Sequence, residues 1–278
     1  MPDLHELDRP EILQVLFHPR SGAKSPVPAQ ARDIDITVAP DAVIGCRLFT
    51  AAKEAPTILF FHGNGEIVQD YNEIGPLYTG QGLNFLVTDY RGYGWSTGRP
   101  SVSALLGDAH ILYREFNRWL PEHGYTGKLF IMGRSLGSAC AIELAAAYNK
   151  DINGLIIESG FADSMPLAET LGLDLAAMGL TEENGFNNAQ KIASVTKPTF
   201  ILHGMRDTLI PIRQAEKLHA ACDARSKELQ VIPGAEHNTM IAVGGILYFQ
   251  AIKRYIDQVT GENNWRSRRK RFKNEQKN

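Results

Sequence analysis

Cysteine is scarce in this sequence, with three residues among 278. Cys46, Cys140 and Cys222 lie far apart, form no C-x-x-C pair and cannot all pair with one another. This spacing argues against a disulfide framework and against a cysteine-based metal or redox motif. We therefore expect reduced cysteines, as in an intracellular protein.

The sequence also lacks a long apolar run. Its first residues include Asp3, Glu6, Asp8 and Glu11 and no continuous apolar segment, which argues against a secretory signal. No later run approaches the roughly 20 residues that span a bilayer. Because 44% of the 278 residues are hydrophobic, the chain can still bury a sizeable core. We predict a soluble, cytoplasmic protein.

A strong overall charge is absent as well, but the net charge of -2 hides an asymmetry. Residues 261–278 carry seven Lys or Arg and two Glu, a net charge of +5, so the preceding residues sum to -7. We interpret 261–278 as a basic, solvated and flexible tail. Contact of this tail with nucleic acid or an anionic surface is the less favoured alternative.

Short apolar runs alternate along the chain with amphipathic segments. Besides a run that begins at residue 128, the predicted strands are 34–38, 43–49, 57–61, 84–88, 154–158, 198–202 and 228–232. The predicted helices are 67–81, a helix capped by Ser101, 139–148 and 240–259. Such alternation is typical of a mostly parallel α/β sheet with helices on both faces, and the first two strands read as an antiparallel edge. Active groups are then expected in loops at the carboxyl ends of the strands.

The domain organisation follows from these elements. We expect an N-terminal packing segment and loop over 1–30, one α/β domain over 31–260, and the tail over 261–278. Residues 163–194 form a partly helical excursion that we interpret as a small cap. Its apolar residues either line a pocket over the site or form the cap's own core, and we favour the core for most of them. They are Met165, Leu167, Leu171, Leu173, Leu175 and Met178.

The feature around which the chain is organised is the pentapeptide 133–137, Gly-Arg-Ser-Leu-Gly, between an apolar run and an alanine-rich segment. This context places Ser135 at a strand-to-helix corner, the nucleophile elbow. Gly133 and Gly137 are small because the helix passes close to the strand there. The backbone N–H of Leu136 begins the helix and is well placed to bind an oxyanion.

A serine hydroxyl needs a base and an orienting acid to act as a nucleophile at neutral pH. Asp207 follows the predicted strand 198–202, and His237 follows the last predicted strand. The order Ser135, Asp207, His237 and the positions at strand ends predict an acyl-transfer triad.

These features, together with the motifs Phe-His-Gly-Asn-Gly at 61–65 and Asp-Tyr-Arg-Gly-Tyr-Gly-Trp-Ser at 89–96, make the chain resemble the α/β-hydrolase superfamily over about residues 34–257. Within it the chain is most similar to small cytosolic serine hydrolases with short caps, the esterases, thioesterases and S33-type peptidases. The resemblance implies that the N–H groups of Asn64 and Leu136 form the oxyanion hole. The chain departs from the HGGG pattern of many esterases, so their acyl-pocket preferences are not carried over.

Each assignment has an alternative. His62 and His203 also follow strands, but each precedes a glycine, and we interpret both as structural residues that shape their loops. Asp89 is expected to order its loop through turn hydrogen bonds. Asp163 competes with Asp207 for the role of acid because some relatives place the acid after the earlier strand. We favour Asp207.

The function predicted from these residues is hydrolysis of an ester or thioester through an acyl-Ser135 intermediate. The alternatives are peptide hydrolysis by the same groups, which needs an acidic anchor such as Glu66, Glu158 or Asp163, and a catalytically silent binding or regulatory protein on this fold. No metal or cofactor is expected, because the sequence shows no metal-ligand spacing, P-loop or dinucleotide fingerprint. The expected partner is a small acyl substrate.

Overall fold

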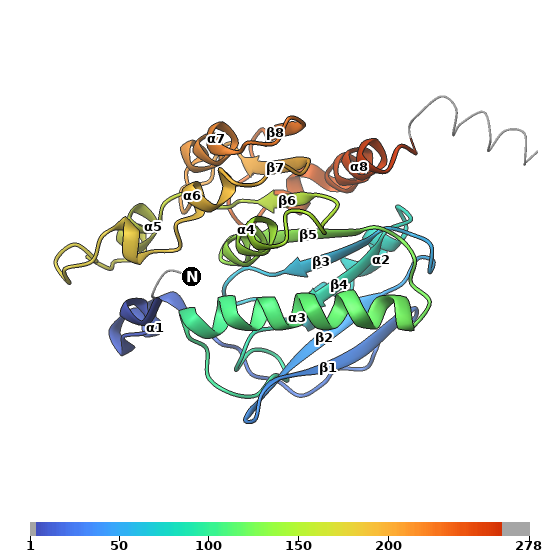
Figure 1. Cartoon of the computed structure of the whole chain (residues 1–278), viewed down its shortest axis with the longest axis horizontal. Helices are drawn as coiled ribbons and strands as arrows, with labels where there is room; N and C mark the ends of the chain where they lie inside the picture. Colours follow the sequence, from blue (N-terminus) through green and yellow to red (C-terminus); the bar gives the residue numbers. More distant parts are fainter. Residues whose placement is uncertain (1–3, 263–278) are drawn as a thin grey trace, which may run out of the picture.

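The computed structural model describes residues 4–262 and is built on one eight-stranded sheet (Figure 1). Its strands are β1 (Ala31–Ala39), β2 (Ala42–Phe49), β3 (Thr57–Phe61), β4 (Asn84–Thr88), β5 (Leu129–Arg134), β6 (Leu155–Glu158), β7 (Thr199–Gly204) and β8 (Lys227–Ile232). The strand order is β1-β2-β4-β3-β5-β6-β7-β8. β1 and β2 pair antiparallel and β2 meets β4 antiparallel, whereas all other pairs are parallel. The predicted mostly parallel sheet with an antiparallel edge is confirmed.

The burial of each strand explains its sequence pattern. Every residue of β3, β4, β5 and β6 is buried, as expected for central strands covered on both faces, and their sequences are mostly apolar. β1 alternates buried and exposed residues over its second half, as a half-exposed edge strand does. β8 closes the other edge, and five of its six residues are only half-buried.

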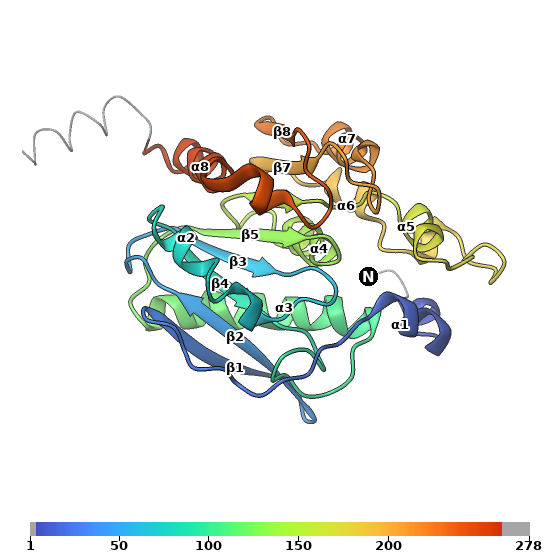
Figure 2. The same ribbon diagram turned by 180° about the vertical axis from the view of Figure 1, so that it is seen from behind.

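Helices cover both faces of the sheet (Figures 1 and 2). α3 (Val102–Glu122), α4 (Gly137–Ala147) and α7 (Ile212–Ala221) pack on one face, and α2 (Gly75–Thr79) and α8 (Met240–Thr260) pack on the other. Each face has its own apolar core. Ser101 caps α3 as predicted, since its hydroxyl accepts a hydrogen bond from Ala104 N at 3.1 Å. A cap of this kind stabilises a helix by about 1 kcal/mol.

Two predicted helices differ in the structure. The single helix expected over 67–81 is wrong: the chain forms a 3₁₀ turn, η2 (Val68–Tyr71), and then the short α2. The break falls just before Pro76, which lacks an N–H and so cannot continue a preceding helix, but which suits the first turn of α2. Gly75 also lets this turn approach β2, because a Cβ there would lie 2.5 Å from the Phe49 ring. The closing helix is kinked at Gly245, which has φ 51° and ψ -140°.

The N-terminal segment and the excursion after β6 meet beyond the carboxyl edge of the sheet (Figures 1 and 2). The N-terminal segment contains η1 (Leu4–Leu7) and α1 (Pro10–Leu16), and the excursion contains α5 (Ser164–Thr170), η3 (Glu182–Asn184) and α6 (Asn188–Ile192). Arg9 Nη1 donates to Met178 O at 3.2 Å. The leucines of the excursion pack against α1 around an apolar cavity of about 30 Å³. Most of its apolar residues therefore serve as the core of this layer, the use favoured from the sequence.

Within residues 4–262 no helix combines the length and apolarity needed to cross a membrane. Cys46, Cys140 and Cys222 are all buried and unpaired. The basic run that begins at Arg266 lies outside the described residues, so its predicted role stays a prediction.

Candidate active site

The elbow has the geometry that its sequence predicts. Ser135 joins β5 to α4 with φ 51°, a left-handed conformation that a non-glycine residue adopts only under constraint. The constraint includes the hydrogen bond from Ser135 N to Glu158 O of the neighbouring strand, 3.0 Å long. A Cβ on Gly133 would lie 2.2 Å from Gly137 O, and one on Gly137 would lie 2.1 Å from Phe61 O. Only glycine therefore allows α4 to pass this close to β3 and β5.

We expect Gly137→Ala to destabilise the fold by about 3 kcal/mol or more, because the added methyl group collides with backbone rather than with a movable side chain. Gly107→Ala is the matched control: it lies inside α3 with open space around its Cβ, so alanine should stabilise by about 0.5–1 kcal/mol. Urea unfolding of both variants measures the difference. Equal stability of the two variants would contradict the close approach at the elbow.

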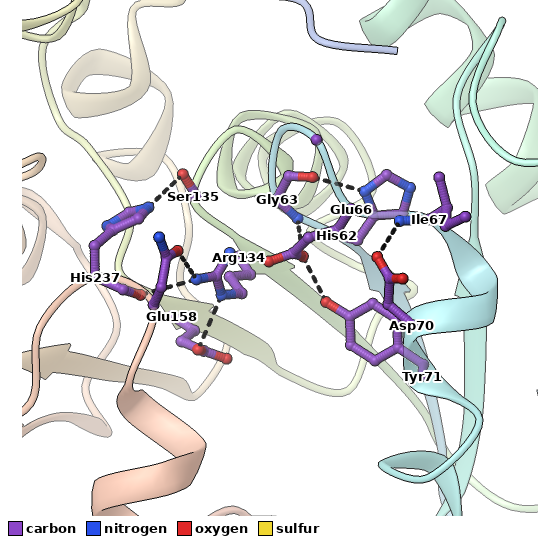
Figure 3. A network of polar contacts seen from close by, with 12 residues as sticks. His62, Gly63, Glu66, Ile67, Asp70, Tyr71, Arg134, Ser135, Glu158 and His237 are labelled. Carbon is purple, nitrogen blue, oxygen red and sulfur yellow. Dashed lines mark hydrogen bonds and ion pairs between the residues drawn. The ribbon is translucent and has the colours of Figure 1, made fainter. Parts of the chain in front are cut away.

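Ser135, His237 and Asp207 form one chain of hydrogen bonds. His237 Nε2 lies 2.9 Å from Ser135 Oγ, and His237 Nδ1 lies 2.7 Å from Asp207 Oδ2 (Figure 3 shows the first contact). A carboxylate accepts the Nδ1–H, which leaves Nε2 free to accept the serine proton. Ser135 and His237 are each 8% exposed and Asp207 is 5% exposed, so the three groups are nearly withdrawn from water yet reachable.

The loop after β7 fixes the Asp207 carboxylate. Its second oxygen, Oδ1, accepts hydrogen bonds from Leu209 N at 3.1 Å and Ile210 N at 2.8 Å. His203 is buried beside it and donates from Nε2 to Ile210 O at 2.7 Å. Burial lowers the pKa of His203, which favours its neutral form. His203 thus shapes the loop, as the sequence analysis expected, and does not contact Ser135.

Asp163 occupies a different environment from Asp207. Both of its carboxylate oxygens accept hydrogen bonds from Lys217 Nζ, at 2.6 and 2.7 Å, on the outer side of α7. Its backbone N–H donates to Gln214 Oε1, and the residue immediately precedes α5. The structure therefore brings Asp207 to His237 and leaves Asp163 in a half-exposed ion pair at the start of the excursion.

The predicted oxyanion donors lie on two loops beside the nucleophile. Leu136 is the residue before α4, and Asn64 lies in the loop after β3. Among residues 4–262, neither backbone N–H donates to a protein acceptor. Both donors therefore remain available to a substrate oxygen.

The side chain of Asn64 has a role that the sequence analysis missed. Its Oδ1 accepts hydrogen bonds from His18 N at 2.9 Å and Tyr93 Oη at 2.7 Å, and its Nδ2 donates to Leu16 O at 2.8 Å. The end of α1 and the segment after it are thus joined to the loop that carries one predicted oxyanion donor. No local sequence pattern predicts these hydrogen bonds, because the partners are 29 to 48 residues away from Asn64 in the chain.

His62 lies under the same loop, where it was expected to be structural. Its Nδ1 lies 2.8 Å from Gly63 O and its Nε2 lies 3.2 Å from Asp89 Oδ1, and the ring is fully buried. Asp89 Oδ1 also accepts from Val68 N at 2.9 Å, and Tyr90 Oη donates to His62 O at 2.6 Å. His62 and Asp89 therefore order the loops after β3 and β4, as the sequence analysis expected.

A buried guanidinium adjoins the triad on the other side of β5. Arg134 forms ion pairs with Glu66 and Glu158 (Figure 3). Tyr248 Oη donates to Glu158 Oε2 at 2.5 Å. Burial opposes the charge of Arg134, but the two carboxylates outweigh it and raise its pKa above the ordinary value. Burial raises the pKa of Glu158 despite the nearby guanidinium. The sequence analysis noted the two glutamates but not their shared partner.

The described residues contain no cluster of three or more His, Cys, Asp or Glu that could hold a metal ion. The polar groups at the elbow pair instead with one another, as serine, imidazole and carboxylate. The chemistry that this arrangement supports is nucleophilic attack by Ser135.

Comparison with known proteins agrees with this geometry. The sequence profile described as serine aminopeptidase, S33, matches residues 52–180 and 183–242, more than half of the chain. The chain belongs to this family, within the α/β-hydrolase superfamily. Protein bem46 of Schizosaccharomyces pombe is 30% identical over 211 residues, which cover 73% of this chain and 68% of that protein. Alpha/beta hydrolase domain-containing protein 17B of Xenopus tropicalis is 30% identical over 228 residues, which cover 77% of this chain and 71% of that protein.

Among solved structures, an esterase of Pyrococcus furiosus superposes with a TM-score of 0.70 at 18% identity, over 86% of this chain and 98% of its own. At this identity the likeness establishes the fold alone. The α/β-hydrolase fold predicted from the sequence is confirmed, and family and fold together make the protein a hydrolase.

Proposed function

We propose that the protein is a serine hydrolase that cleaves a carboxylic ester or thioester through an acyl-Ser135 intermediate. The observation that carries this proposal is the continuous hydrogen-bonded path from Ser135 Oγ through the His237 ring to Asp207 Oδ2, 2.9 and 2.7 Å in its two steps. This path supports the proposal, because acyl transfer by a serine needs a base that accepts its proton and an acid that orients the base.

Acylation uses these groups in order. Ser135 Oγ attacks the substrate carbonyl carbon as His237 Nε2 takes the hydroxyl proton. Asp207 stabilises the imidazolium, and the N–H groups of Asn64 and Leu136 donate to the oxyanion of the tetrahedral intermediate. The intermediate collapses when the bond to the alcohol or thiol breaks, and the imidazolium returns its proton to that leaving group. The product of this half-reaction is the acyl-serine ester.

Deacylation repeats the cycle with water. His237 Nε2 takes a proton from a water molecule, which attacks the acyl carbon, and the same N–H groups stabilise the second oxyanion. Collapse breaks the bond to Ser135 Oγ, which regains its proton from the imidazolium. A carboxylic acid leaves, and the enzyme returns to its starting state.

The family's description names an aminopeptidase, which makes peptide hydrolysis the second candidate. An aminopeptidase needs an acidic anchor for the substrate's ammonium group. The three acids considered from the sequence are already paired: Glu66 and Glu158 with Arg134, and Asp163 with Lys217. This pairing supports an ester or thioester rather than a peptide with a free amino terminus.

The experiment is a panel of p-nitrophenyl esters of increasing acyl length, run beside acyl thioesters and aminoacyl p-nitroanilides. We expect turnover of esters or thioesters, and at least about 100-fold lower kcat/KM for the anilides, whose amine leaving group is poorer and whose ammonium group has no anchor. A preference for the anilides would establish the peptidase instead. Absence of all turnover, together with no labelling of Ser135 by a fluorophosphonate, would point to a catalytically silent protein.

A further inference from the structure

Arg134, the residue before the nucleophile, contacts the loop that carries the base. Its Nη2 donates to His237 O at 2.8 Å and to Asn238 Oδ1 at 2.8 Å. Arg134 is 8% exposed, and its guanidinium points away from the Ser135 hydroxyl (Figure 3). Arg134 therefore holds the backbone of His237, whose ring contacts Ser135, the residue next to Arg134 in the chain.

The same guanidinium reaches the loop that carries the Asn64 donor. Arg134 Nη1 pairs with Glu66, and the other oxygen of Glu66 accepts hydrogen bonds from Gly63 N at 2.7 Å and from Tyr71 Oη at 2.6 Å. Arg134 thus links the 63–66 loop to the loop of His237 through one planar group (Figure 3). A guanidinium suits this task because its donors diverge in a fixed fork.

Polar contacts rather than packing hold Arg134 in place on its outer side. A cavity of about 540 Å³ lies there, with walls from α2 and α8, and Arg134, Glu66, Glu158 and Asn238 all line it. The position of the guanidinium therefore depends on Glu66, Glu158 and the base loop, and loss of one partner lets the others move.

We propose that Arg134 is a positioning residue for the reaction, which keeps the base loop at His237 and the oxyanion loop at 63–66 in register with each other. This inference rests on the proposed function. Arg134 makes no contact with Ser135 Oγ and need not touch substrate. Arg134 instead aligns the groups that do contact substrate, on the His237 loop and the 63–66 loop. A displacement of about 1 Å in such groups can lower the rate about 100-fold.

The main test is Arg134→Gln, whose amide is too short to span the two loops. We expect kcat to fall about 10- to 100-fold with KM changed by less than about threefold, because alignment matters most in the transition state. The second-order rate of fluorophosphonate labelling at Ser135 should fall by a similar factor. That reaction needs the nucleophile, base and oxyanion donors but few substrate contacts, so a substrate-binding role for Arg134 would leave it unchanged.

Arg47→Gln is the matched control. Arg47 is also a buried arginine in an ion pair, with Asp33 and with Asn72 as a further acceptor, but it lies on β2 away from the elbow. Its loss should lower the melting temperature while leaving kcat and the labelling rate within about twofold of wild type. The comparison separates loss of alignment from loss of stability.

Glu66→Gln provides a milder variant if Arg134→Gln fails to fold. Its amide oxygen can still accept from Gly63 N, while the ion pair with Arg134 is removed and Glu158 continues to balance the guanidinium. We expect about a 3- to 10-fold slower labelling rate. Adding Glu66→Gln to Arg134→Gln should cost nothing further, because both act through one link.

A folded Arg134→Gln that is labelled at the wild-type rate would overturn the inference. An equal loss of labelling rate in Arg47→Gln would also overturn it. If only the milder variant folds, a labelling rate of Glu66→Gln within twofold of wild type would overturn it as well. A wild-type protein that is not labelled at Ser135 would overturn the proposed function itself, and this inference with it. The two failures are therefore distinguishable.

Discussion

We expect Ser135→Ala to lower kcat/KM for any ester that the protein hydrolyses by at least about a thousandfold, and to leave the melting temperature within a few degrees of wild type. The large kinetic effect is expected because no other group replaces the nucleophile, and the triad acts as a unit. The small effect on stability is expected because the change removes one hydroxyl and its bond to His237. Steady-state kinetics and thermal unfolding measure the two quantities.

The control for this prediction is His237→Ala, which should cost nearly as much as Ser135→Ala, and the double variant little more. If Ser135→Ala retained more than about a tenth of the wild-type kcat/KM, Ser135 would not be the nucleophile. Activity lost in Ser135→Ala but retained in His237→Ala would leave the nucleophile in place and assign the base elsewhere.

We expect Asp207→Asn to lower kcat by about two to four orders of magnitude, with a modest change in KM. In the variant, an amide oxygen can still accept from Leu209 N and Ile210 N, so the loop keeps its hydrogen bonds. The amide NH₂ then faces His237 Nδ1, where Asp207 Oδ2 accepts a hydrogen bond at 2.7 Å. This donor favours the imidazole tautomer with the proton on Nε2, which cannot take the proton of Ser135.

Asp163→Asn is the matched variant, since it removes the other candidate carboxylate. We expect it to change kcat by less than about tenfold. It breaks a half-exposed ion pair with Lys217, and such pairs contribute about 0–1 kcal/mol. Circular dichroism should first show that both variants are folded. A severe loss in Asp163→Asn with little change in Asp207→Asn would transfer the role of acid to the earlier position.

The parts of the site that could be predicted from the sequence are those with a local signature. At Gly133 and Gly137 the backbones of α4, β5 and β3 come so close that no side chain fits. The five consecutive residues 133–137 are enough to predict this close approach. Asp207 and His237 each follow a strand, and parallel strands deliver their following loops to one edge of the sheet. Position along the chain was therefore enough to predict that these residues meet Ser135.

The contacts that could not be predicted join segments with no common pattern. Asn64 reaches Leu16, and Arg134 reaches Glu66 and His237, across 48, 68 and 103 positions of sequence. Their hydrogen bonds depend on side-chain directions that are fixed only after the sheet is assembled. The break before α2 was missed for another reason: the apolar spacing of 67–81 suits a helix, and Pro76 together with the close approach at Gly75 overrides it.

Because β8 lies at the edge of the sheet, the stability of the whole fold and the time for which the site stays aligned are separate properties of this protein. His237 stands on the loop that follows this strand, which pairs with β7 alone among the described strands and is only half-buried over most of its length. Edge elements with little burial open locally at a lower free energy than the whole fold. We expect such an opening of β8 to carry His237 away from Ser135 while the central strands stay paired. On this expectation a mutation in the core could raise the global stability of the fold without lengthening the time for which Ser135 and His237 stay aligned.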